Sequence, residues 1–307
     1  MLKYTLKRLW QTIPTTLGVL LLSFVLFNVI GGSPAESLLG KNATKEAIAA
    51  FNAKWGYDRP LYEQFFRFVT DVFSGNLGYS VEYQENVVDV LARGVWPSLS
   101  LTVPILLGGV VLAIFLALLA ASYRGRFADK AVLLFSTVFM SVNYVVWVLA
   151  GQFFLAYKAE IFPVWGYESA TYLILPVLIG IFSSLGADVR FFRAAILDEI
   201  FRPYVLAVRA KGVPGFFVMT RHVLRNSLVP IVTYVSLSIP YLFTGSLLLE
   251  GFFGIPGLGS VSINAIHSSD MAVVRAVVVI GALLYQFVNL ATDLLYAFLD
   301  PRVRLDL

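Results

Sequence analysis

The chain is organised around the polar segment Pro203-Tyr-Val-Leu-Ala-Val-Arg-Ala-Lys-Gly-Val-Pro-Gly-Phe-Phe-Val-Met-Thr-Arg-His-Val-Leu-Arg-Asn226, which lies between two apolar runs. Pro203 favours the first position of a helix, where its missing N–H needs no partner. Arg209 and Lys211 place positive charge in the last turn, and Gly212 suits the left-handed position that ends a helix. The pattern predicts a short helix, a glycine corner and a second helix beginning near Pro214. Such an element suits docking onto a partner protein, although an ordinary basic loop has the same periodicity.

The composition is that of an integral membrane protein. Of the 307 residues, 58% are hydrophobic and 14% are charged, whereas a soluble domain carries about 25% charged residues. The absence of cysteine excludes disulfides, thiolate metal sites and a cysteine nucleophile. The net charge of +4 follows the membrane topology and does not indicate nucleic-acid binding. The first apolar run is too long for the apolar region of a removable signal peptide.

Six segments are long and apolar enough to cross about 30 Å of hydrocarbon as helices. We place these spans near residues 10–30, 99–122, 132–156, 171–188, 228–249 and 275–298. Lysine and arginine concentrate at the amino terminus, in the loops after the second and fourth spans, and at the carboxyl end. The positive-inside rule therefore predicts that both termini are cytoplasmic.

The long loop after the first span carries helix signals. Thr44 is a candidate N-cap for a helix that ends at Gly56, and Pro60 can begin a second helix that ends at Gly75. A third short helix is expected near residues 85–93. These signals predict a small helical cap on the outer membrane surface. Within the spans, Asn143 and Gln152 indicate helix packing or a polar path.

Several of these segments resemble the binding-protein-dependent ABC importer permeases, in particular the dipeptide, oligopeptide and nickel family. The 203–226 segment is similar to the family's cytoplasmic "EAA" loop, although the family's glutamate falls at Leu206 and its second alanine at Val208. In that family the loop is a coupling helix that sits in a groove of the ATPase subunit. The resemblance assigns the coupling role to Tyr204, Ala207, Arg209, Ala210, Lys211, Gly212, Arg221, His222, Arg225 and Asn226.

The glycine-rich segment after the fifth span, Gly254-Ile-Pro-Gly-Leu-Gly259, permits two arrangements. One is a re-entrant filter-like loop and the other is an external loop with a short surface helix. The resemblance favours the second, because the segment matches a family motif of the extracytoplasmic gate and binding-protein face. It assigns that role to Gly254, Pro256, Gly257, Gly259 and Asp270. The family's Arg-Asp-Tyr is replaced here by Ser269-Asp270-Met271.

The last span carries Asn289 and Asp293, four residues apart on one helix face. Together with the following residues, up to Arg304, they resemble the family's carboxyl-terminal signature. Asp293 lies about two turns from the cytoplasmic end. It is better suited to helix packing, or to an ion pair with a cytoplasmic arginine, than to carrying a proton.

The sequence has no phosphate-binding Gly-x-x-x-x-Gly-Lys-Ser/Thr motif, so this chain is not itself the ATPase. No nucleophile motif or metal-ligand cluster is present, and neither a catalytic site nor a metal site is expected. His222 and His267 are the only histidines and fall on opposite sides of the membrane.

The expected fold is an all-α membrane protein with six transmembrane helices, the type I ABC importer permease fold and an extracytoplasmic helical insert after the first helix. The expected regions are 1–30 (amino terminus and first helix), 31–96 (extracytoplasmic insert), 97–300 (permease domain, coupling loop 189–227) and 301–307 (cytoplasmic tail).

The resemblance implies one permease subunit in a bacterial or archaeal plasma membrane. Its partners would be a homologous permease, two ATPase subunits that bind ATP and Mg²⁺, an extracytoplasmic binding protein and the lipid bilayer. An ion- or proton-coupled secondary transporter is the alternative, and a channel built around the Gly-Pro loop is a weaker one. The substrate, whether peptide, nickel or another solute, does not follow from the sequence.

Overall fold

The computed structural model describes residues 2–30, 44–239, 242 and 246–299. The predicted 301–307 tail and the start of the predicted insert, residues 31–43, lie outside the described residues. The chain divides into two compact units. The first comprises Met1–Ser98, Phe243–Leu247 and Pro256–Leu307, and the second comprises Leu99–Leu242 and Leu248–Ile255.

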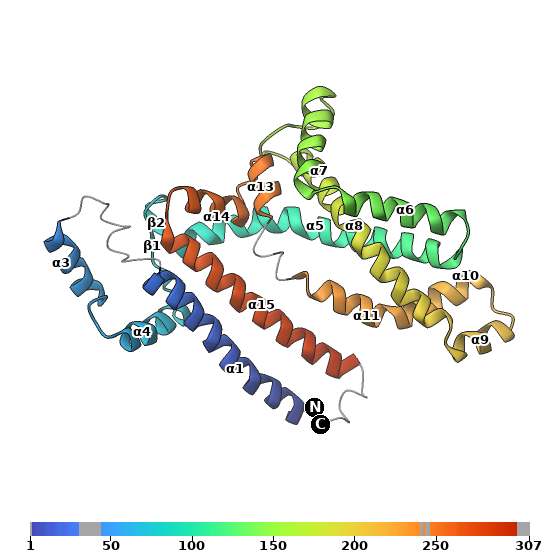
Figure 1. The fold of residues 1–307 in the computed structure, drawn as a ribbon, viewed down its shortest axis with the longest axis horizontal. Helices are drawn as coiled ribbons and strands as arrows, with labels where there is room; N and C mark the ends of the chain where they lie inside the picture. Colours follow the sequence, from blue (N-terminus) through green and yellow to red (C-terminus); the bar gives the residue numbers. More distant parts are fainter. Residues whose placement is uncertain (1, 31–43, 240–241, 243–245, 300–307) are drawn as a thin grey trace. The chain divides into compact units, whose positions relative to one another are not determined.

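The first unit contains helices, one short hairpin and the start of the longest helix (Figure 1). Its elements are α1 (Leu2–Phe24), η1 (Val25–Ile30), α3 (Lys45–Trp55), α4 (Leu61–Phe73), β1 (Tyr79–Ser80), β2 (Glu85–Asn86), the first turns of α5 (Val87–Ser122), α14 (Leu258–His267) and α15 (Met271–Leu299). In the hairpin, β1 pairs antiparallel with β2, so that Tyr79 lies opposite Asn86.

The helix ends predicted after the first span are confirmed. The Thr44 hydroxyl accepts a hydrogen bond from the Ala47 N–H and caps α3, which ends at Gly56 with φ +73°. Helix α4 lies between Pro60 and Gly75, whose φ is +78°. The short helix expected near residues 85–93 is not separate, because α5 continues from Val87 into the second predicted span.

Two apolar clusters hold the first unit together. In one, α4 packs on the paired helices α1 and α15, with Leu20, Phe24, Phe68 and Val279 all buried. The ring of Phe24 contacts those of Phe65 and Phe68, at centroid distances of 5.5 and 5.9 Å. The other cluster joins the first turns of α5 to α14 and α15 through Val87, Val90, Leu91, Leu258, Val261, Ala265, Val273 and Ala276.

In the second unit, every regular element of the described residues is a helix. Besides most of α5, it contains α6 (Phe127–Ser141), α7 (Tyr144–Gly151), η2 (Gln152–Lys158), α8 (Thr171–Ile200), α9 (Pro203–Ala210), α10 (Gly215–Phe217), η3 (Val218–Val223), α11 (Leu224–Ser236) and α13 (Leu247–Phe253). The first residue of α13, Leu247, is assigned to the first unit. Helix α8 is central: α6, α7 and α11 all pack against it.

Four helices in the described residues are long and apolar enough to cross a membrane, and six candidates result if two bent helix pairs each count as one span. The four lie at Arg8–Ile30, Val87–Ser122, Thr171–Ile200 and Met271–Asp293. They correspond to the predicted first, second, fourth and sixth spans. The predicted fifth span is represented by α11, which ends at Ser236, while residues 240–241 and 243–245 lie outside the described residues.

The predicted third span, 132–156, is not one straight helix. It is divided into α6 and α7–η2, which meet at an angle of 92°. Val142 and Asn143 have extended backbone conformations at the break, and the Asn143 side chain accepts a hydrogen bond of 2.9 Å from the Val145 N–H. Asn143 is therefore the N-cap of a new helix, a position that asparagine favours over a helix interior.

Candidate functional site

The segment around Gly212 has the predicted backbone. Pro203 occupies the first turn of α9, Arg209 lies in its last turn, and Lys211 follows the helix. Gly212 has φ +77°, and a Cβ there would meet nothing within 4 Å. Its glycine requirement therefore comes from the backbone conformation alone, since L-residues rarely adopt this φ. The chain then continues helically from Gly215 through α10 and η3 into α11.

One face of this helical corner is built into the second unit. Val205 of α9 and Val218 and Val223 of η3 are fully buried. They belong to a cluster that also contains Phe192 and Ile196 of α8. Because α9 and η3 share one core with the end of α8, a displacement of the corner has to displace α8 as well.

Polar contacts reinforce this attachment. The Tyr204 hydroxyl donates a hydrogen bond of 2.9 Å to Glu199 Oε2 at the end of α8. Burial, aided by the adjacent Glu199 carboxylate, raises the pKa of the Tyr204 phenol, so Tyr204 stays protonated as a donor. The Ser227 hydroxyl bonds the Val223 carbonyl at 3.0 Å and lies 3.4 Å from the Ala195 carbonyl of α8.

An ion pair also supports the carboxyl-terminal part of α8. Arg193 makes a bidentate contact with Asp129 of α6, with Nε–Oδ1 at 2.7 Å and Nη2–Oδ2 at 2.8 Å. Asp129 Oδ2 also accepts a hydrogen bond of 2.8 Å from the Gly125 N–H. The two side chains are only 18% and 5% exposed. The paired guanidinium and carboxylate fix α6 against α8 close to the corner.

The opposite face of α9 is open. Leu206 is 64% exposed, and Ala207 and Ala210 are exposed beside it. After the glycine corner, Phe216 and Phe217 are also exposed. Among the other predicted coupling residues, Arg209, Lys211, Arg221, Arg225 and Asn226 are exposed, whereas Tyr204 and His222 are half-buried. The corner thus presents apolar side chains bordered by cations, a surface suited to insertion into a protein groove.

The residues predicted for the gate fall into both units. Gly254, in the second unit, has φ +67°, and a Cβ there would lie 2.1 Å from Trp165 Cε2. The adjacent Gly166 N–H donates a 2.8 Å hydrogen bond to the Phe253 carbonyl. The Gln152 amide donates to the carbonyls of Phe252 and Val164, at 2.8 and 3.0 Å. Sequence reasoning missed Trp165 in this role, and a polar glutamine within an apolar run was the only signal for Gln152.

In the first unit, Gly257 precedes α14 with an extended backbone, and Gly257 and Gly259 are buried. The Leu258 N–H donates a 2.8 Å hydrogen bond to the Ser98 hydroxyl of α5. Pro256 is exposed. A Cβ at Gly94 would lie 3.1 Å from the Leu258 nitrogen. Gly94 therefore allows the start of α14 to lie directly against α5.

Asp270 is buried, with 2% exposure, and precedes α15. Its Oδ2 atom accepts hydrogen bonds from the Ser80 hydroxyl and the Glu82 N–H, and its Oδ1 atom from the Val273 N–H. Asp270 therefore caps α15 and ties it to the β1–β2 hairpin.

Asn289 and Asp293, the two residues predicted to pack helices together, lie near the carboxyl-terminal end of α15. Asp293 Oδ2 forms an ion pair of 3.1 Å with Arg8 Nη1 of α1. Asn289 is half-buried one turn earlier. Gln286, on the same helix, donates a 2.6 Å hydrogen bond to the Thr15 hydroxyl of α1.

In the part of the chain that the structure describes, no group of three or more His, Cys, Asp or Glu residues is placed to hold a metal ion.

Comparison with known proteins agrees with this architecture. Residues 109–305 match the family described as "Binding-protein-dependent transport system inner membrane component", and residues 1–102 match its amino-terminal family. The chain is 32% identical to the glutathione transport system permease protein GsiC of Escherichia coli strain CFT073, 31% to that of strain K12 and 32% to that of Salmonella paratyphi A. Each alignment covers 99% of both chains. The chain therefore belongs to the inner membrane components of binding-protein-dependent transport systems, the permease subunits of ABC importers.

Proposed function

We propose that this permease subunit, together with a homologous permease, forms the translocation pathway for a short peptide or similar small solute. An extracytoplasmic binding protein delivers the solute, and two ATPase subunits drive the cycle. ATP and Mg²⁺ bind to those ATPase subunits and not to this chain. Family membership favours this function over an ion-coupled secondary transporter, because importers of this kind are built around ATPase and binding-protein partners.

The single observation that carries the proposal is the two-faced corner at Gly212. Its inner face is buried against α8 through Val205, Val218 and Val223, while Leu206, Ala207 and Ala210 face outward. A docking element needs both properties, since the outward face binds the ATPase and the inner face transfers its movement. The ATPases shift the permease between inward- and outward-facing states only by binding those states differently.

The named relatives are glutathione permeases, so glutathione is the first substrate to test. Glutathione is a short peptide with two carboxylates, a ligand that a binding protein of this transporter class can deliver. We further propose that both termini and the Gly212 corner lie in the cytoplasm, as the distribution of lysine and arginine predicts. The 44–86 segment then lies on the extracytoplasmic side, in the bacterial inner membrane.

Co-purification of the full-length chain with ATPase subunits tests the proposal. Ala210→Glu places an unpaired carboxylate on the outward face of α9 and should remove the ATPase subunits from the purified complex. Ala128→Glu is the matched control, because Ala128 is partly exposed in the other predicted cytoplasmic loop with lysine and arginine. Retention of the ATPase subunits by Ala210→Glu, or their absence from the wild-type complex, contradicts the proposed docking.

A further inference from the structure

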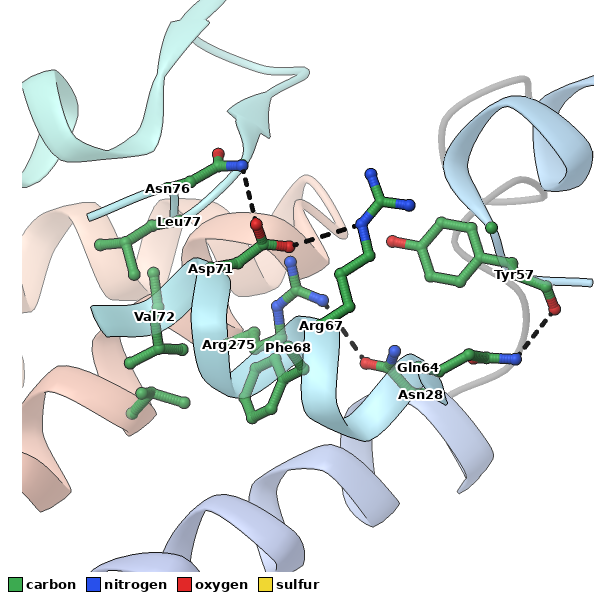
Figure 2. A pocket seen from close by; sticks show the side chains of 14 residues that line it. Asn28, Tyr57, Gln64, Arg67, Phe68, Asp71, Val72, Asn76, Leu77 and Arg275 are labelled. Atoms are coloured by element: carbon green, nitrogen blue, oxygen red, sulfur yellow. Dashed lines mark hydrogen bonds and ion pairs between the residues drawn. The ribbon is translucent and has the colours of Figure 1, made fainter. Parts of the chain in front are cut away.

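The first unit contains a cavity of about 110 Å³ between α4, the end of η1, the Asn76–Gly78 segment and the start of α15 (Figure 2). The volume is well above the roughly 10–15 Å³ that one water molecule needs. Two arginines and one aspartate line the cavity, so its charged side chains carry one net positive charge. Neither the coupling role nor the gate role uses this cavity.

Arg275 is the central cation of the cavity. Its guanidinium lies over the Phe68 ring, 5.8 Å from the centroid, and its Nη1 lies 3.4 Å from Asn28 Oδ1. Among the described residues, no carboxylate lies within ion-pair distance of Arg275. The aromatic ring and the amide position the guanidinium but leave its charge uncompensated, which suits it to binding an anion.

The second cation, Arg67, extends from α4 toward the same cavity (Figure 2). Its Nε lies 4.0 Å from Asp71 Oδ2, a long and partly exposed ion pair. Asp71 Oδ1 also accepts a hydrogen bond of 3.2 Å from the Asn76 amide. A Cβ at Gly56 would lie 2.9 Å from Arg67 Nη1, so the glycine leaves room for this side chain. Asp71 thus reduces the positive charge of the cavity without neutralising it.

The position of the cavity along α15 indicates which anion it meets. Arg275 is the fifth residue of α15, and the apolar sequence that follows is long enough to cross a membrane. The start of such a span lies at the membrane–water interface, where phospholipid headgroups lie. Arg275 is therefore at the level of the lipid phosphates in the leaflet next to the 44–86 segment.

Helix α4 has the character of an interfacial helix. Its inner face packs on α1, while Tyr62, Phe66 and Phe73 are 63%, 67% and 68% exposed. These three residues follow the helical spacing i, i+4, i+11 and form one stripe. Aromatic side chains of this kind favour the interface, where acyl chains meet headgroups. A lipid whose phosphate enters the cavity would have acyl chains available to this stripe.

We propose that the cavity lined by Asn28, Arg67, Phe68, Asp71, Asn76 and Arg275 binds the phosphate of a glycerophospholipid in the adjacent leaflet. Arg275 supplies the principal charge-assisted hydrogen bonds, and Arg67 supplies a second cation. The outward stripe of α4 contacts the lipid's acyl chains. This site is independent of the transported substrate and of the ATPase, and it fixes α4 to the membrane surface.

Native mass spectrometry of the full-length chain, delipidated in detergent, tests the site. The probes are phosphatidylglycerol and a diacylglycerol with the same acyl chains, which lacks the phosphate. Phosphatidylglycerol should bind about tenfold more tightly, and Arg275→Gln should remove most of that preference because one charge-assisted contact is lost. Arg275→Lys, which keeps the charge, should retain part of it. Arg93→Gln is the control, since Arg93 is exposed on α5 and does not line the cavity.

Asp71→Asn keeps the proposal testable even if the arginine variants fold poorly. It removes the one negative charge of the lining, so phosphatidylglycerol binding should increase about threefold, a gain that misfolding does not produce.

The site is refuted if the two lipids bind equally, if Arg275→Gln binds phosphatidylglycerol like the wild type, or if Asp71→Asn weakens binding. Complete displacement by millimolar inorganic phosphate would also contradict it, because the ligand is then a soluble anion. Loss of binding-protein association in Arg275→Gln, with lipid binding unchanged, would reassign the surface to that protein.

Discussion

The Ser80 hydroxyl donates a hydrogen bond of 2.6 Å to Oδ2 of Asp270, a residue 190 positions further along the chain. Ser80 Oγ in turn accepts a hydrogen bond of 3.0 Å from the Tyr83 N–H. Both side chains are buried, at 0% and 2% exposure. The β1–β2 hairpin is therefore held against the start of α15 by a small polar network whose members all have partners, the arrangement in which burying a carboxylate is least costly.

Asp270→Ala should destabilise the protein more than any substitution of an exposed aspartate. It removes the cap of α15 and leaves two donors without their acceptor, the buried Ser80 hydroxyl and the partly buried Glu82 N–H. Each such loss costs about 1–3 kcal/mol. The apparent melting temperature of the purified chain measures the effect, and Asp58→Ala, an exposed aspartate of the 44–86 segment, is the control. Combining Asp270→Ala with Ser80→Ala should cost less than the sum of the single substitutions. An additive pair would show that the two side chains are not coupled.

Local chemistry made part of the structure predictable. The helix from Thr44 to Gly56 and the corner at Gly212 each depend on a cap or on a glycine with positive φ, which neighbouring residues specify. Asn143 carried a similar local signal, but the long apolar run around it favoured one continuous span. An N-cap within such a run requires the chain to bend there. The contacts that stabilise the bend come from residues distant in sequence, and the periodicity of the run gives no information about them.

Contacts between distant segments were not predictable in the same way. Gly254 was identified through a motif, yet its need for glycine comes partly from the Trp165 ring, 89 positions away. Asp270 was assigned to a binding-protein face, and the structure gives it the hairpin as its neighbour. Nothing in the spacing of Arg67 and Arg275 indicates that they share a cavity, because only the packing of α4 on α15 brings them together.

Gly254→Ala should be strongly destabilising for two separable reasons. The φ of +67° is strained for any L-residue, and the new Cβ would overlap the Trp165 ring. Gly75→Ala is a matched control, because Gly75 has φ +78° and nothing within 4 Å of a Cβ. Gly75→Ala should therefore show the backbone strain alone, about 1–2 kcal/mol. Trp165→Ala removes the ring that the new Cβ would overlap. In a chain that already carries Trp165→Ala, Gly254→Ala should therefore lower the melting temperature by less than it does in the wild-type chain. Equal losses in Gly254→Ala and Gly75→Ala would show that the ring contact contributes nothing.

Asp293→Asn should leave transport and its pH dependence close to those of the wild type. Its ion pair with Arg8 is partly exposed, at 41% for the arginine side chain and 34% for the aspartate. Such a pair contributes about 0–1 kcal/mol. The measurement is uptake by the reconstituted transporter, for the variant and the wild type, over a range of roughly three pH units around neutrality. A loss of uptake together with an altered pH profile would instead indicate that Asp293 carries a proton.

Gly212→Val should uncouple ATP hydrolysis from uptake while the chain still inserts into the membrane. A β-branched residue resists the φ of +77°, and relieving about 1–2 kcal/mol of strain would turn α9 away from its position against α8. We expect uptake in proteoliposomes to fall about tenfold, with ATP hydrolysis less affected.

Two glycines isolate the cause of that loss. A Cβ at Gly215 likewise meets nothing within 4 Å, but Gly215 lacks a positive φ, so Gly215→Val should transport normally. Gly125 has the same φ as Gly212 and the same open surroundings, but it lies in the loop before α6. If Gly125→Val lowers uptake as much as Gly212→Val, the loss is not specific to the Gly212 corner, because strain at Gly125 can also disturb the contact of its N–H with Asp129. Selective loss in Gly212→Val requires that the corner between α9 and α10 itself transmits the movement.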